Sequence, residues 1–410
     1  MSPTPDQDTT GIVETVRAKV VDPLTDFLDD EVLGGLLLLI AAVVAVAWAN
    51  SPWSDAYFDL WHTHVAIAGI DLDLHGWVND LLMAVFFFVV GMEIKRELVT
   101  GELRDRRAAA LPAIAAAGGV LLPALIYLLV VSGSAGEAAG GWAVPAATDI
   151  AFAVGVLALL GARVASGVRL FLLSIAIVDD LIAIAIIALV YSSGLSAAWF
   201  AIALAAVALV VVLQRLGVAQ PLAYLLPAAV LWVAVFESGV HATIAGVLLG
   251  LLMPARPFRG RDVHTAIEHR IHPLSAYVIV PLFALANAGV DFRDGVLADA
   301  LSEPVTWGVA GGLVVGKLVG ITAATLVTLK LRLGRLPAGM ERSHVAGVAA
   351  LGGIGFTVSL FVAELAFDDP ALTDAAKVGI FIASLVAGAL GTLLLLARRR
   401  AGGAAGAPEG

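Results

Sequence analysis

The segment LFLLSIAIVDDLIAIAIIALVY, residues 170–191, is apolar apart from Ser174, the terminal Tyr191 and two adjacent acids, Asp179 and Asp180. A helix of this length crosses a hydrocarbon core of about 30 Å. Ionisable groups in the middle of a membrane span are costly, and they persist mainly where they face a partner or a water-filled cavity. The segment therefore predicts a membrane-spanning helix that carries a functional site.

Similar apolar segments recur along the chain. Of its 410 residues, 60% are hydrophobic and 14% are charged, and the mean hydropathy is +0.96. We expect an all-α polytopic membrane protein with about twelve transmembrane helices, each near the ~20 residues that a bilayer needs. The expected spans cover residues 32–49, 77–91, 108–131, 142–161, 170–191, 197–213, 221–236, 240–253, 272–290, 306–329, 344–366 and 375–396. Residues 31–397 are thus expected to form the transmembrane domain, between an acidic cytoplasmic tail at 1–30 and a short cytoplasmic tail at 398–410.

The distribution of charge predicts the orientation. All but three of the 24 lysines and arginines fall in alternate connections between the expected spans or in the two tails; the exceptions are Arg293, Lys317 and Lys377. Because Lys and Arg gather in cytoplasmic loops, both termini should be cytoplasmic. The formal charge of −10 argues against a nucleic-acid partner, and the absence of cysteine excludes disulfides and thiolate metal sites.

Five ionisable residues stand out within the expected spans: Asp80, Asp149, Asp179, Asp180 and Lys317. Neighbours on a helix point about 100° apart, so one of Asp179 and Asp180 can face an ion while the other faces a partner. Two carboxylates this close in a low dielectric repel, so the pair should take up a proton readily and exchange it for a hard cation. Lys317 is expected to pair with Asp179, although a lysine can also snorkel to an interface.

Two of the expected spans contain signals that interrupt a helix. Pro145 precedes Asp149 in the fourth span, and the run Gly352-Gly353-Ile354-Gly355 lies in the eleventh. If spans 3–5 and 10–12 are inverted repeats, the two interruptions cross near the midplane, where Asp149 and Lys317 would balance the helix dipoles. Two other interpretations stay open: Asp149 as a helix cap, and the glycine run as a close-packing surface.

Five of the eight histidines fall into two groups. His62, His64 and His75 lie with several acids in the first external connection, where a solvated acidic loop explains them better than a metal site. Glu268, His269 and His272 lie at a cytoplasmic helix start, where a pH-sensing role and a capping role are equally good explanations.

The chain resembles the NhaA family of sodium/proton antiporters from about residue 30 to residue 396. The resemblance rests on motifs that occur in the family's order: Gly35 to Ala42, Asn79 to Phe88, Gly91 to Leu98, Pro145 to Phe152, Asp179-Asp180, Ser238 to Thr243, Phe283 to Gly289, Gly316-Lys317 and Gly353 to Thr357. Each motif alone is modest, but together they are highly specific. The acidic tail and Glu364 fall outside the match.

The resemblance implies a function and a set of roles. It implies an electrogenic exchanger of internal Na⁺ or Li⁺ for external H⁺ in the bacterial inner membrane, often dimeric through the first external connection, without a cofactor. Asp180 would be the main ion ligand, with Asp179 exchanging protons and pairing with Lys317. Thr148 and Asp149 would line the helix crossing, Thr148 as a further Na⁺ or Li⁺ ligand. The residues that match pH-control positions are Glu93, His241, Glu268, His269 and His272.

Two other functions compete with ion exchange. A sodium-coupled symporter would need a pocket with groups for an organic solute. An intramembrane aspartyl protease would pair Asp149 with Asp180, but it leaves Lys317 unexplained, and the chain has no Gly-x-Gly-Asp motif. We therefore expect a transporter and not an enzyme.

Overall fold

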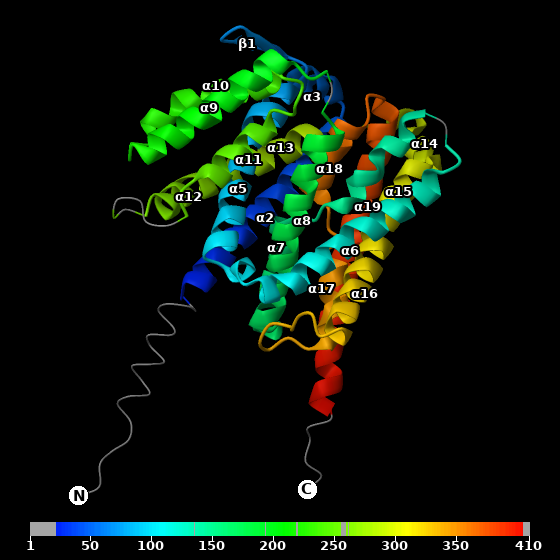
Figure 1. The fold of residues 1–410 in the computed structure, drawn as a ribbon. Helices are drawn as coiled ribbons and strands as arrows, with labels where there is room; N and C mark the ends of the chain where they lie inside the picture. Colours follow the sequence, from blue (N-terminus) through cyan, green and yellow to red (C-terminus); the bar gives the residue numbers. More distant parts are fainter. Residues whose placement is uncertain are drawn as a thin grey trace, which may run out of the picture.

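The computed structural model describes residues 22–134, 136–192, 194–218, 220–255, 260 and 262–404, with the backbone alone for 22–31, 102, 106, 162, 294 and 398–404. Most of the predicted acidic tail, the end of the predicted C-terminal tail, and Arg256, Arg259 and Arg261 lie outside the described residues. The described chain is a bundle of helices, in which α2 begins and α19 ends at the same end of the molecule (Figure 1).

The apolar segments fold as helices because a backbone in lipid must satisfy its hydrogen bonds internally. The α-helices are α2 (Asp22–Ala49), α3 (Ser54–Trp61), α4 (Leu74–Gly76), α5 (Met83–Val99), α6 (Arg106–Val131), α7 (Ile150–Leu160), α8 (Ser166–Val190), α9 (Ala197–Arg215), α10 (Leu222–Glu237), α11 (Thr243–Leu252), α12 (Val263–Leu274), α13 (Val280–Asn287), α14 (Val296–Ser302), α15 (Pro304–Gly311), α16 (Lys317–Lys330), α17 (Val345–Leu351), α18 (Phe356–Ala366) and α19 (Pro370–Ala404). Short 3-10 segments are η3 (Glu102–Arg104), η4 (Gly136–Ala146), η5 (Gly161–Arg163), η7 (Arg293–Gly295) and η9 (Arg342–His344). Three π-helical segments are η2 (Trp77–Leu82), η6 (Ser275–Ile279) and η8 (Gly312–Gly316).

These helices confirm an all-α polytopic membrane protein. Within the described part of the chain, seven helices are long and apolar enough to cross a bilayer, or nine if each of two bent helix pairs is one span. Helices α10 and α11 are apolar but shorter. The expected number of twelve spans stays a prediction.

Strands are confined, in the described residues, to one antiparallel hairpin of β1 (His64–Ile67) and β2 (Ile70–Asp73). Ala68 and Gly69 form its turn with positive φ angles, which glycine adopts without strain. His64 is well exposed and lies 3.3 Å from Asp71, in agreement with a solvated acidic connection. The same interpretation is wrong for His75, because its ring lies in α4 against Asn287 and its side chain is only 29% exposed.

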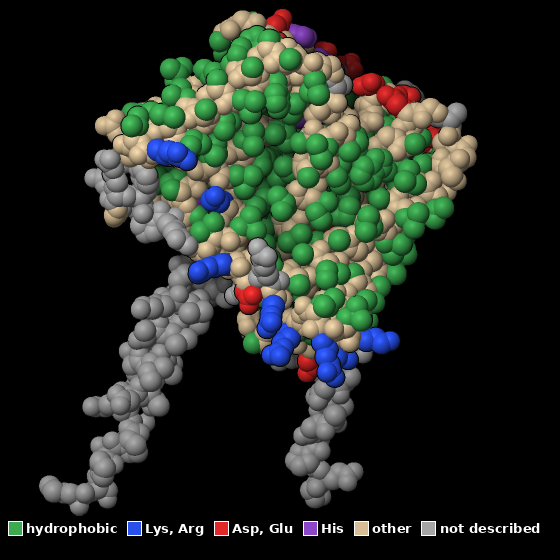
Figure 2. All heavy atoms as spheres, in the orientation of Figure 1, with side chains coloured by type: hydrophobic (Ala, Val, Ile, Leu, Met, Phe, Trp, Pro, Cys, Tyr) green, Lys and Arg blue, Asp and Glu red, His purple; other side chains and the backbone are tan. Residues whose placement is uncertain are grey.

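The surface of the molecule is divided by polarity. Figure 2 shows hydrophobic side chains over the middle of the face in view, with most Lys and Arg toward its lower edge and left side and most Asp and Glu above. Large apolar side chains such as Leu121, Leu189 and Leu385 are at least 70% exposed. Water would make so broad an apolar surface costly, so this belt is typical of a protein whose middle lies in lipid.

Small residues bring several helices into close contact. On α11, Gly246 lies against the carbonyl of Ala84 in α5; Gly118 of α6 and Gly320 of α16 face each other in the same way. A methyl group at any of these positions would collide with backbone, as is usual where membrane helices pack through glycine. These contacts hold α5 against α11 and α6 against α16.

Candidate ion site at the crossing of two bent helix pairs

Two bends meet in the middle of the bundle. The first bend, of 41°, lies at residues 147–149 between η4 and α7. The second, of 48°, lies at residues 352–355 between the helical segment Arg342–Leu351, which is made of η9 and α17, and α18. Pro145 and the glycine run lie at these two bends. A carbon on Gly353 would lie 2.5 Å from the Leu313 carbonyl oxygen, so the glycine run also serves close packing.

Hydrogen bonds join the two bends directly. The Asp149 amide donates to the Ile354 carbonyl at 2.6 Å, and the Ser359 hydroxyl donates to the Val144 carbonyl at 2.8 Å. Thr148 Oγ1 lies 2.8 Å from the Gly352 carbonyl oxygen. Backbone groups released from helical bonding at each bend thus find partners in the other bend, which buried polar groups require.

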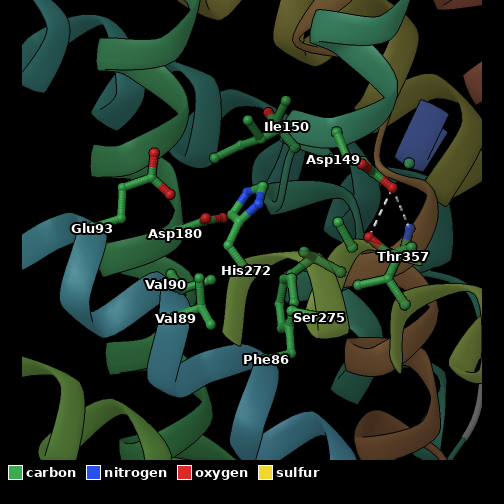
Figure 3. Close-up of a pocket in the computed structure, with 16 residues that line it drawn as sticks. Phe86, Val89, Val90, Glu93, Asp149, Ile150, Asp180, His272, Ser275 and Thr357 are labelled. Atoms are coloured by element: carbon green, nitrogen blue, oxygen red, sulfur yellow. Dashed lines mark hydrogen bonds between the residues drawn. The ribbon is translucent and has the colours of Figure 1, made fainter. Parts of the chain in front are cut away.

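The Asp149 carboxylate caps both half-helices that start at the crossing. Its Oδ1 accepts from the Phe152 amide of α7 at 2.9 Å. Its Oδ2 accepts from both the amide (2.9 Å) and the hydroxyl (2.7 Å) of Thr357 on α18, as the dashed lines in Figure 3 show. The capping interpretation is therefore correct. A negative charge at two helix N-termini also balances their dipoles.

The buried Lys317 forms the expected ion pair with Asp179. Its Nζ lies 2.5 Å from Asp179 Oδ2, 2.5 Å from the Ala146 carbonyl oxygen and 3.1 Å from Thr148 Oγ1. Both charged side chains are 0% exposed, so Lys317 does not snorkel to an interface. A buried pair of this kind depends on having all its partners in place, because a lone buried charge is strongly destabilising.

Asp180 lines a cavity that Asp179 does not line. The cavity, of about 90 Å³, is lined by Asp180, Thr148 and Asp149 together with Glu93 and His272. Figure 3 shows these acids and His272 around it. One oxygen each of Asp179 and Asp180, the Oδ1 atom, is buried and has no hydrogen-bond partner among the described residues. Such oxygens are costly unless they bind a proton or a cation.

The donor set indicates which cations suit the site. Carboxylate, hydroxyl and carbonyl oxygens are hard ligands, which favour alkali and alkaline-earth ions over softer transition metals. Among the described residues, no three His, Asp or Glu side chains are grouped so as to hold a metal ion. Asp179 and Asp180 together outweigh the single positive charge of Lys317, and Asp149 and Glu93 add further acid at the cavity, so the site favours a bound proton or cation.

The remaining predicted residues are divided between the cavity and other places. Glu93 and His272 line the cavity. Glu268 pairs with Arg96 at 2.5 Å and does not line it, and the exposed His269 and the partly buried His241 also lie elsewhere. Asp80 lies in η2, away from the cavity.

Sequence reasoning missed several contributors to this region. Thr357 bonds Asp149, Ser275 of η6 lines the cavity, and His264 lies 3.7 Å from Glu268. Thr357 entered the sequence analysis only as the last residue of the Gly353 to Thr357 motif, two residues after the glycine run. In addition, each of the three basic residues that departed from the charge alternation pairs with an acid: Lys317 with Asp179, Lys377 with Glu364 and Arg293 with Asp291.

Apolar helices around a buried site of two acids and one lysine define a multi-pass membrane protein whose interior is suited to handling small cations and protons. Residues 25–395 match the family model described as Na⁺/H⁺ antiporter 1. The chain belongs to this family of Na⁺/H⁺ antiporters, which are membrane transporters of bacteria, and the resemblance to NhaA is confirmed.

Individual relatives are similar over almost their whole length. The antiporter NhaA of Mesorhizobium japonicum is 46% identical over 397 residues, which cover 95% of this chain and 98% of the relative. That of Bordetella parapertussis is 48% identical, over 93% of this chain and 98% of the relative. Antiporter NhaA 3 of Frankia alni is 44% identical, over 93% and 90% respectively.

Proposed function

We propose that this protein carries Na⁺, or Li⁺, out of the cell in exchange for external protons, and that ion and protons compete for one site at Asp179 and Asp180. The single observation that carries this is the Asp180 carboxylate, buried at the cavity with one unpartnered oxygen, beside an Asp179 that Lys317 already neutralises. Thr148 is the third proposed ligand, because its hydroxyl lies 2.7 Å from Asp179.

Competition follows from electrostatics. Two ionised carboxylates in a low dielectric repel, so the site is stable when a proton or a cation reduces the negative charge. A bound Na⁺ lowers the proton affinity of both acids and drives protons off, and a bound proton removes a ligand charge that Na⁺ needs. The site therefore does not hold Na⁺ and its full number of protons at the same time.

The exchange is proposed to be electrogenic. If Asp180 and Asp179 both take up protons in place of one Na⁺, one net charge crosses the membrane in each cycle. That charge is worth about 2.3 kcal/mol per 100 mV, so the membrane potential would drive Na⁺ outward without ATP.

The remaining architecture is proposed to follow the same scheme. The two bent pairs would be interrupted fourth and eleventh spans of a twelve-span, inverted-repeat domain over residues 31–397, tilting to expose the site to either face. Both tails, 1–30 and 398–410, would be cytoplasmic, in the inner membrane of a bacterial cell. A homodimer would form through the first external connection.

Control by pH is proposed for the residues near the cytoplasmic mouth. Glu93 and His272 line the cavity, and Glu268 is tied to Arg96 on the facing helix α5. Titration of these groups would change the charge along the route to Asp180. His269 and His241 are assigned to the same control only by the family resemblance.

The test is sodium-driven proton movement in reconstituted vesicles. Adding Na⁺ to one side should change the internal pH for the wild type, and Asp180→Asn should abolish that change. Asp80→Asn is the matched control, because it removes another acid from a membrane helix without touching the cavity. An unchanged internal pH in the wild type would exclude antiport, and full activity of Asp180→Asn would exclude this site.

A further inference from the structure

A second group of charged side chains lies at the opposite end of α18 from the ion site. Glu364 Oε1 on α18 is 2.7 Å from Lys377 Nζ on α19, and Glu364 Oε2 is 3.9 Å from His75 Nε2 on α4. The side chains of Lys377 and Glu364 are only 10% and 19% exposed. The proposed exchange reaction uses none of these three residues.

Asn287 determines which nitrogen of His75 carries the proton. Asn287 Nδ2 donates to Asn79 Oδ1 and to the Phe283 carbonyl, so its Oδ1 is the acceptor that lies 2.9 Å from His75 Nε2. His75 Nε2 must therefore be a donor. His75 Nδ1 then carries no proton in the neutral ring and is the position that a further proton would take. Asn79 Nδ2 lies 3.4 Å from His75 Nδ1 and 3.3 Å from His75 Nε2, and it donates to Asn287 Oδ1 at 3.2 Å.

The charges around Glu364 include one more acid than base. Glu364 and Asp374 carry two negative charges against one positive charge on Lys377, and an imidazolium at His75 would complete the balance. Asp291, which also faces Asp374, is neutralised by Arg293 at 2.6 Å. The other titratable groups near this cluster are Asp73, which caps α4, Asp80 in η2 and Tyr57, whose phenol faces Glu364. Asp73 and Asp80 add further negative charge on this side of His75, and the phenol of Tyr57 is uncharged.

Helix α18 connects this cluster to the ion site. Glu364 is seven residues, about two turns, from Thr357, so the two side chains lie on the same side of α18. Thr357 is the residue that bonds Asp149. Glu364 and Lys377 join α18 to α19, and the contact of Glu364 with His75 spans the boundary between these two helices and the pair formed by α4 and α13.

We propose that His75 and Glu364 form a proton-binding site at the external end of the protein, which locks α18 against α4 and α13 when His75 is charged. The proposal rests on the proposed alternating access and deepens it. The cluster lies toward the end of the bundle that carries the β1–β2 hairpin, away from the end where α2 begins (Figure 1). A charged His75 would attract Glu364 across the 3.9 Å that separate His75 Nε2 from Glu364 Oε2. External acid then holds the external side shut and slows exchange.

The test varies the pH on the external side alone. Wild type, His75→Gln and the control His64→Gln are reconstituted in one orientation with the internal pH clamped, and exchange is followed at external pH values from about 5.5 to 8, across the ordinary titration range of imidazole. His64 is the matched control because it also faces an acid in the external connection but is 68% exposed. The ratio of the His75→Gln rate to the wild-type rate should be near one at the alkaline end and rise to about fivefold at the acid end, the size of effect expected for one partly exposed ion pair.

Two outcomes would overturn the proposal: a ratio that stays constant over the whole external range, or an equal change in His64→Gln. A separate variant covers the acid. Glu364→Gln should give the same loss of dependence on external pH, and the double variant Glu364→Gln with Lys377→Gln covers the case in which an unpaired Lys377 prevents folding. Failure of antiport itself would appear differently, as wild-type vesicles that show no sodium-driven pH change at any external pH.

Discussion

The two bends at the centre of the molecule are built by different means. The half-helix α7 is capped by a residue of its own segment, because Asp149 precedes it and accepts from Phe152. The half-helix α18 starts after Gly355, which offers no side chain, and it receives its cap from the same Asp149 across the crossing. One carboxylate therefore serves two helices, and the glycine bend depends on the proline bend for its stability.

The largest expected effect comes from removing the shared cap. Asp149→Ala should lower the free energy of unfolding by about 2–4 kcal/mol, because it uncaps two helices and leaves buried donors without partners. Equilibrium unfolding in detergent micelles measures this. A loss no larger than one ordinary cap, about 1 kcal/mol, would show that the two bends are independent.

Crowding the glycine bend should have the next largest effect. Gly353→Ala places a carbon against the Leu313 carbonyl and should destabilise by about 1–3 kcal/mol. The matched control is Gly388→Ala on α19, where the nearest atom would be 3.7 Å away and no loss is expected. Equal unfolding curves for the two variants would contradict the close packing described for Gly353.

Removing one contact across the crossing should cost less. Thr357→Val deletes the hydroxyl that donates to Asp149 but keeps the amide bond, so a loss of about 1–2 kcal/mol is expected for a buried hydrogen bond to a charged group. The same unfolding assay applies, with Thr357→Ser as the variant that retains the hydroxyl. If Thr357→Val lowered the free energy of unfolding as much as Asp149→Ala does, the contact of Asp149 with α7 would contribute nothing of its own, and the two helices would not share the cap.

The smallest effect is expected at Ser359. Its hydroxyl donates to the Val144 carbonyl, a neutral pair, so Ser359→Ala should lose only about 1 kcal/mol. This variant leaves the carboxylate contacts intact and should retain sodium-driven proton exchange in vesicles. A loss of transport with little loss of stability would instead place Ser359 in the moving part of the crossing.

The sequence allowed the membrane class, the acid pair and the partner of Lys317 to be predicted, because each depends on local apolarity or on the high cost of a buried charge. Both bends also lie where Pro145 and the glycine run predicted interruptions. The dual role of Asp149 could not be predicted, since Thr357 is 208 residues away and only the packed fold brings them together. For the same reason His75 was assigned to a solvated loop, although Asn287, 212 residues away, holds its ring.

Burial of the ammonium at Lys317 has a consequence for leakage. Without cargo, the two acids and the lysine keep one uncompensated negative charge in a nonpolar interior, a state that is costly to carry through a rearrangement of the helices. In the proposed mechanism, a bound proton or sodium ion lowers that cost. A rearrangement of the helices without a bound ion would then be disfavoured, and uncoupled slippage would dissipate little of the ion gradient.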